Sequence, residues 1–162
     1  VMFEKYECEL EGAPIHAVLH NISDMGNLGT AIRSLLGFGI RDVALIRPCC
    51  DPFDPRVQRA SMGAFYAANV RQYDDFAQYR ARFPARALYP FMLDGALPLP
   101  RAAKAAAFPA TLVFGNEAAG LPQEFAALGQ PVRIPQSDEI DSFNLAAAIS
   151  VAAYAFSCRE DI

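Results

Sequence analysis

Residues 15–39 read IHAVLHNISDMGNLGTAIRSLLGFG, and this stretch decides the fold. The short apolar run Ile15–Leu19 predicts a buried strand. Apolar side chains three and four residues apart then predict a helix over Asn27–Phe38, which Asp24 or Asn27 can cap at its start and Gly39 at its end. A strand followed directly by a helix that can pack on it is the repeating unit of α/β proteins.

Similar apolar runs, each bounded by Gly, Pro, Asn or Asp, recur at Val43–Ile46, Ala87–Phe91, Thr111–Phe114 and Val132–Ile134. Helically spaced segments separate them, so we expect an α/β fold with a mostly parallel sheet flanked by helices. The last helix, from about Asn144 to Phe156, is rich in alanine, which indicates the close approach of another helix or backbone. No repeat or linker divides residues 1–162, so a single domain is expected.

The composition excludes several classes of protein. With 53% hydrophobic and 20% charged residues the chain is too apolar for disorder. The longest uncharged run, 145–158, is shorter than the ~20 residues of a membrane span, so no membrane partner is expected. The acidic N-terminus lacks the basic start and apolar run of a secretory signal, which favours a cytoplasmic location and reduced cysteines.

The charge balance gives no general sign of a nucleic-acid partner, because the net charge is −4. Binding to RNA would therefore need a local basic surface. The candidates for it are Arg41, Arg47, Arg56, Arg59 and Arg71.

Three polar segments follow predicted strands. In the first, residues 20–29 (HNISDMGNLG), Gly26 and Gly29 either permit a tight turn or aim backbone N–H groups at an anion. This is not the G-x-G-x-x-G fingerprint, and the second strand runs into Arg47 instead of an acid, so a classical NAD site is disfavoured. The second, 112–122 (LVFGNEAAGLP), ends a strand in a glycine turn, and the third, 134–145 (IPQSDEIDSFNL), leads into the last helix, which Ser142 or Asn144 can cap.

Taken together and in this order, the segments resemble the motifs of the SpoU (TrmH-like) family of RNA ribose 2′-O-methyltransferases, within the SPOUT superfamily. Residues 27–33 (NLGTAIR) resemble N-x-G-x-x-x-R, and 114–121 (FGNEAAGL) resemble F-G-x-E-x-x-G-L. Residues 134–135 (IP) with 142–145 (SFNL) resemble I-P-M…S-L-N-L/V, and 59–64 (RASMGA) are similar to a segment common between the first two motifs. The resemblance runs from about Ile15 to Phe156, and minimal members of this kind are of the TrmL type, which modifies the ribose of a tRNA wobble nucleotide.

The resemblance implies a C-terminal deep trefoil knot whose loops hold S-adenosylmethionine. By motif position, the cofactor-binding residues are expected to be Phe91, Met92, Gly115, Asn116, Ile134, Ser142 and Leu145. It also implies a homodimer with its active site where the two chains meet, and the first and last helices are the candidates for that interface.

Methyl transfer requires a ribose 2′-OH in line with the donor methyl group, and a group that stabilises the oxygen as its proton leaves. The family's catalytic arginine corresponds to Arg33, for which we favour gripping a substrate phosphate and stabilising negative charge, because a guanidinium stays protonated. Asn27, Asn144 and Ser142 are expected to position the hydroxyl or hold Arg33, and Glu117 to organise its turn or face the substrate. The implied substrate is RNA, tRNA in preference to rRNA, with no role for DNA or for a metal.

The third segment departs from the family pattern. Gln136 stands in place of the usual Met, Phe143 in place of Leu or Met, and Asp138, Glu139 and Asp141 make the loop acidic. These departures leave open the alternative of a knotted RNA- or nucleotide-binding module without efficient methyl transfer. The Gly26–Gly29 turn separately leaves open a small α/β enzyme that binds phosphate, although no P-loop, nucleophile elbow or catalytic His arrangement accompanies it.

Overall fold

The computed structural model describes residues 8–158, so residues 1–7, on which the expectation of no secretory signal partly rests, lie outside the described range. Five parallel strands form the main sheet in the order β3-β2-β1-β6-β4. Their bounds are Ile15–His20 (β1), Asp42–Ile46 (β2), Asn69–Tyr73 (β3), Ala87–Pro90 (β4) and Ala110–Phe114 (β6). The expected α/β fold with a parallel sheet is confirmed.

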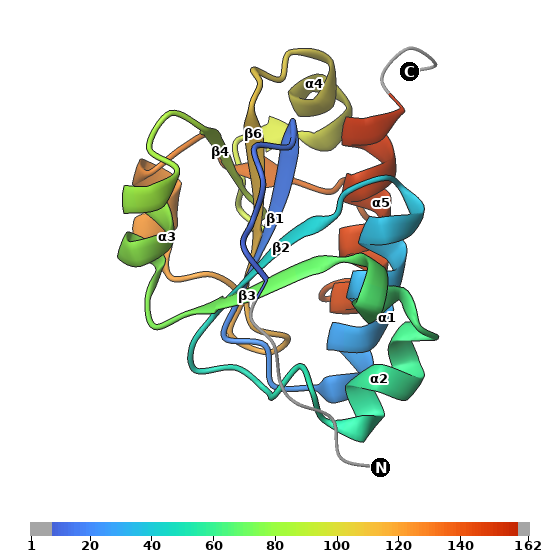
Figure 1. Ribbon diagram of the computed structural model, residues 1–162. Helices are drawn as coiled ribbons and strands as arrows, with labels where there is room; N and C mark the ends of the chain where they lie inside the picture. The colour runs from blue at the N-terminus through green and yellow to red at the C-terminus, as the bar shows by residue number, and fades with distance from the viewer. Residues whose placement is uncertain (1–7, 159–162) are drawn as a thin grey trace.

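Helices cover both faces of this sheet, as Figure 1 shows, with α1, α2 and α5 on one side and α3 on the other. The helices are α1 (Met25–Gly37), α2 (Pro55–Ser61), α3 (Phe76–Arg82), α4 (Leu99–Lys104) and α5 (Leu145–Ser157), with 3₁₀ turns η1 (Ala64–Ala67) and η2 (Gln123–Ala127). A second, two-stranded parallel sheet pairs β5 (Leu97–Pro98) with β7 (Val132–Arg133).

Alternating side chains of the strands enter two separate cores, as the period of two residues in a strand requires. Leu19 and Leu112 pack with the apolar stripe of α1 and with α5. Val18 and Val113 pack on the other face with Tyr79 of α3. The sheet is therefore buried on both faces, and its free edges and strand ends are where a ligand can reach it.

The first helix begins and ends at the residues that the sequence marks. The Asp24 side chain caps α1 by accepting a 2.6 Å hydrogen bond from the Asn27 N–H. Gly39 follows the helix with a φ of +79°, and its N–H donates to the Leu36 carbonyl at 3.0 Å. Of the two caps considered, Asp24 is the one used.

The prediction that Gly26 and Gly29 form the strand-to-helix turn is wrong, because both lie inside α1. A Cβ on Gly29 would lie 2.5 Å from the carbonyl oxygen of Val57 and 2.5 Å from the Cβ of Ala60. Gly29 therefore lets α1 and α2 approach closely instead of freeing N–H groups for a ligand.

Two further strands differ from the sequence prediction. β3, with sequence NVRQY, was not predicted, because it lies at the sheet edge and most of its side chains are polar. The run Val132–Ile134 was expected in the main sheet, but β7 belongs to the small sheet. Residues 92–97 hold β7 in this place. The Met92 N–H donates to the Val132 carbonyl at 2.9 Å, and the Leu97 N–H donates to the Pro131 carbonyl at 3.1 Å. The trefoil knot itself stays a prediction.

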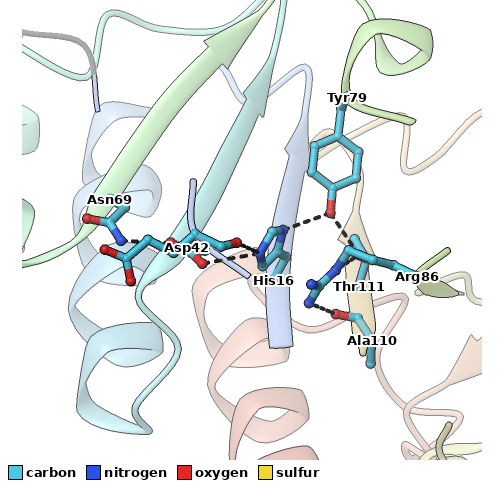
Figure 2. A network of polar contacts seen from close by, with 8 residues as sticks. His16, Asp42, Asn69, Tyr79, Arg86, Ala110 and Thr111 are labelled. Atoms are coloured by element: carbon cyan, nitrogen blue, oxygen red, sulfur yellow. Dashed lines mark hydrogen bonds and ion pairs between the residues drawn. The ribbon is translucent and has the colours of Figure 1, made fainter. Parts of the chain in front are cut away.

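A buried polar network crosses the sheet near the amino ends of its strands (Figure 2). The Tyr79 hydroxyl lies 3.1 Å from His16 Nδ1 and 2.7 Å from the Thr111 hydroxyl, whose oxygen accepts from Arg86 Nε at 3.0 Å. On the other side of the ring, His16 Nε2 lies 3.1 Å from a carboxylate oxygen of Asp42. With Asn69, which donates to Asp42 at 2.7 Å, the network ties four neighbouring strands and α3 together through groups that would each be costly to bury alone.

Asp42 is the acidic member of this network and is fully buried. Burial alone would raise the pKa of its carboxyl, but the His16 ring beside it and the hydrogen bond from Asn69 outweigh burial and hold the pKa below its usual value. Stability that depends on this carboxylate is consequently lost in acid.

The cysteines and the helix lengths agree with what the composition predicts. Cys8, Cys49, Cys50 and Cys158 are all free, as predicted. Across residues 8–158, every helix is too short or too polar to traverse a bilayer.

Candidate functional site

A pocket of about 330 Å³ opens beside the carboxyl ends of β4 and β6. Its walls come from three parts of the chain: residues 91–94, 114–123 and 132–148. All seven residues expected to bind a cofactor line it: Phe91, Met92, Gly115, Asn116, Ile134, Ser142 and Leu145. Its volume is within the roughly 300–1,000 Å³ typical of small-molecule sites.

Most of the side chains that line the pocket are apolar, and two are acidic. The ring of Phe91 stacks on that of Phe114, with centroids 4.6 Å apart. Asp94 and Glu117 also line the pocket, whereas no Lys, Arg or His of residues 8–158 does. Such a pocket favours a ligand with flat or apolar parts and a positive charge, and it disfavours a phosphate.

The loop between Gly115 and Gly120 forms one wall and is tightly folded. The Asn116 N–H donates to the Gly120 carbonyl at 3.1 Å, and the Gly120 N–H returns a bond of 2.9 Å to the Asn116 carbonyl. Gly120 has a φ of +68°, and a Cβ on Gly115 would lie 2.2 Å from the carbonyl carbon of Gly120. Both glycines are therefore required by the backbone of this wall.

Glu117 joins the pocket to the start of α1. Its carboxylate accepts hydrogen bonds from the Asp24 N–H at 3.1 Å and from the Ser23 hydroxyl and N–H at 3.1 and 3.3 Å. Burial alone would raise the pKa of Glu117, but bonds from backbone N–H groups, its own included, and from the Ser23 hydroxyl hold the pKa below its usual value.

This arrangement corrects the interpretation of the Gly26–Gly29 segment as an anion-binding turn. The N–H groups of Ser23 and Asp24 are already bonded to the Glu117 carboxylate, and that of Asn27 is bonded to the Asp24 carboxylate. A phosphate placed there would meet two negative charges, so the phosphate-binding alternative loses its site.

A chain of side-chain hydrogen bonds brings the three motif segments together. Asn27 Nδ2 donates to Glu117 at 3.5 Å, and Asn144 Nδ2 donates to Asn27 Oδ1 at 3.0 Å. The Asn144 oxygen in turn caps α5, so Asn144 and not Ser142 is the cap of that helix. Farther along the same helices, the Ser150 hydroxyl donates to the Ser34 hydroxyl at 2.8 Å. The close approach that the alanines of α5 indicate is therefore made by α1.

Arg33 lies apart from this chain of bonds. It is exposed on α1, does not line the pocket, and within residues 8–158 makes no ion pair or side-chain hydrogen bond. Asn27 and Asn144 contact each other instead of holding the guanidinium. Arg33 is therefore available to a group that comes from outside the described chain.

The predicted basic surface is largely neutralised by carboxylates. Arg47 pairs with Asp74 at 2.6 Å and Arg56 with Asp54 at 2.9 Å, and Arg71 pairs with Glu9. Only two of the five candidates, Arg41 and Arg59, make no such pair among the residues that the structure describes.

Several pocket residues carried no recognisable signal in the sequence. Leu93 and Asp94 follow β4 in a turn, Gln123 begins η2, and Val132 and Ala148 are ordinary apolar positions. Only the folding of the chain around β7 brings these residues to one cavity.

A parallel sheet with helices on both faces and a pocket outside the carboxyl ends of its strands defines a ligand-binding α/β protein. The model of the SpoU rRNA Methylase family matches residues 14–154, and the chain belongs to this family.

The most similar proteins include one curated relative and two solved structures. An uncharacterized tRNA/rRNA methyltransferase of Synechocystis is 29% identical over 87% of this chain and 53% of its own length. A structure from work on the 2-OH methylation of C/U34 on tRNA superposes with a TM-score of 0.83 at 29% identity, covering 91% of this chain and 96% of that one. An AdoMet-bound rRNA methyltransferase from Sinorhizobium meliloti superposes with a TM-score of 0.82 at 29% identity, covering 97% and 59%. The chain spans about half of the curated relative's length.

Proposed function

We propose that the protein is an S-adenosylmethionine-dependent methyltransferase that methylates a ribose 2′-OH in RNA, tRNA in preference to rRNA. The observation that carries the proposal is the convergence of the three motif segments at one pocket through Glu117, Asn27 and Asn144. The similarity to the structure concerned with 2-OH methylation on tRNA supports the choice of tRNA, since it covers almost all of both chains.

The chemistry of the pocket fits S-adenosylmethionine, which supplies an electrophilic methyl group on a positively charged sulfur. Phe91, Ile134 and Leu145 offer apolar surface for the adenine, and the backbone at Gly115 and Asn116 offers hydrogen-bonding groups. Met92 and Ser142 complete these walls. The carboxylates of Asp94 and Glu117 suit a cationic ligand and oppose a dinucleotide with its phosphates.

We propose that Arg33 contacts the RNA substrate. An exposed guanidinium can form two parallel hydrogen bonds to a phosphate and stabilise an oxygen that becomes negative as the hydroxyl proton leaves. Glu117 and Asn27 hold the start of α1 against the pocket, and so they set where Arg33 is presented two turns farther along that helix.

We also propose that α1 and α5 form the interface of a homodimer. Val151 and Tyr154 of α5 are 43% and 48% exposed, and the Tyr154 ring meets Phe38 at the end of α1. Pairing of this apolar face with a second copy would bury it. Because Arg33 does not line the pocket of its own chain, we propose that the dimer places it at the pocket of the partner. Light scattering should then give about twice the 17.6 kDa mass, and a strict monomer at high concentration would contradict a shared site.

Incubation of the full chain with tRNA, rRNA and a deuterated methyl donor, followed by nucleoside mass spectrometry, tests the proposed reaction. We expect a labelled 2′-O-methyl nucleoside from tRNA. Binding of the donor without label in any RNA would favour the alternative of a binding module. Label on a base instead of a ribose would refute the proposed site of methylation.

A further inference from the structure

The loop that follows β7 is exposed and acidic. Residues 137–141 are all exposed and include Asp138, Glu139 and Asp141. Within the loop, the Glu139 N–H donates to the Ser137 hydroxyl at 3.2 Å, and the Ile140 N–H donates to the Ser137 carbonyl at 3.5 Å. Three carboxylates in four residues repel one another, so the loop needs other contacts to stay folded.

Gln136 supplies such contacts from the edge of the pocket. Its side-chain nitrogen donates to the Asp141 carbonyl at 3.0 Å and to the Ile140 carbonyl at 3.3 Å. The two bonds close the loop on itself across residues 137–141. Methionine, the residue usual here in the family that the sequence resembles, has no N–H and cannot make them.

The closed loop leads directly into two residues of the pocket wall. Ile134 lies before the loop, Ser142 and Phe143 lie directly after it, and all three line the pocket together with Gln136 itself. Asn144, the next residue, is fixed as the cap of α5 and as the partner of Asn27. Loss of the Gln136 bonds should therefore loosen the residues between Gln136 and the anchored Asn144.

We propose that Gln136 is a positioning residue that closes the acidic loop and thereby holds Ser142 and Phe143 in the conformation that binds S-adenosylmethionine. The inference rests on the proposed function, because it concerns the affinity of the same pocket. Gln136 acts by preorganisation: an open loop would have to be ordered each time the donor binds.

The test compares Gln136→Met with the wild type by calorimetric titration of S-adenosylmethionine. Gln130→Met is the matched control, because its side-chain nitrogen also donates to one carbonyl, that of Pro131, but does not line the pocket. We expect the dissociation constant to rise about tenfold in Gln136→Met and to stay unchanged in the control. High salt should reduce the ratio between Gln136→Met and wild type, because it screens the repulsion that opens the loop.

Hydrogen exchange without ligand provides a second measurement on the same proteins. Amides of residues 137–143 should exchange faster in Gln136→Met than in wild type, while those of the sheet and the melting temperature stay the same. Equal donor affinity or equal exchange in wild type and Gln136→Met would overturn the inference and leave the proposed function standing. Failure of the wild type to bind the donor would overturn both.

Discussion

Replacement of Gly115 by alanine tests whether the wall of the pocket is built as described. The new Cβ would lie 2.2 Å from the Gly120 carbonyl carbon and 2.4 Å from the Leu121 nitrogen. These are backbone atoms and cannot rotate away, so the two hydrogen bonds between Asn116 and Gly120 must lengthen or break. Two bonds at ~1 kcal/mol each, with overpacking of ~1–3 kcal/mol, give a loss of about 3–5 kcal/mol in the free energy of unfolding.

Gly37→Ala is the matched control, because nothing lies within 4 Å of its Cβ position in the last turn of α1. Alanine there should leave stability unchanged or raise it by ~0.5–1 kcal/mol, since alanine is the better helix former. Urea unfolding followed by circular dichroism measures both variants, and titration with S-adenosylmethionine measures the effect on the pocket. At ~2–4 °C per kcal/mol for a chain of this size, Gly115→Ala should also melt about 6–20 °C lower. An equal urea midpoint and equal donor affinity in the two variants would refute the close contact of Gly115 with Gly120.

Three further substitutions probe other parts of the structure. Arg33→Ala should keep the wild-type affinity for S-adenosylmethionine but lower transfer to RNA about a hundredfold or more, and undiminished turnover in a methylation assay would remove Arg33 from the reaction. Gly29→Ala should lower the free energy of unfolding by ~1–3 kcal/mol, because its Cβ would meet Val57 and Ala60, and a urea midpoint like that of wild type would contradict this packing. Asp42→Asn should cost ~1–3 kcal/mol at neutral pH. The folded pKa of Asp42 is lowered, so its stabilisation is complete above the unfolded pKa near 4 and is lost as the pH falls through the folded value. Urea unfolding at a series of pH values should therefore show the gap between wild type and Asp42→Asn closing in acid, and a gap that widens in acid would disprove this sign.

The elements that could be predicted from the sequence are those whose signal is local. The helices α1 and α5 carry clear apolar stripes with Asp24 and Asn144 as caps, and the structure has them within two residues of the predicted bounds. The buried strands are short apolar runs because both of their faces are covered. β3 was missed for the opposite physical reason: an edge strand needs few apolar residues, and NVRQY has only one aliphatic residue.

The candidate site was predicted less completely, because its contacts join residues far apart in the chain. Glu117 was recognised, but its bonds to Ser23 and Asp24 span more than 90 residues and have no local signal. Gln136 was noticed only as a departure from a pattern, and its bonds to the loop show what the departure does. The arginines were expected to form a basic surface, because a sequence does not show which carboxylates will neutralise them.

The central claim is that three separate segments of the chain form one binding site for S-adenosylmethionine, and calorimetry of the full chain tests it most directly. We predict a single site per chain with a micromolar dissociation constant, which weakens when Gly115 is replaced by alanine. No heat of binding at millimolar S-adenosylmethionine would contradict the account.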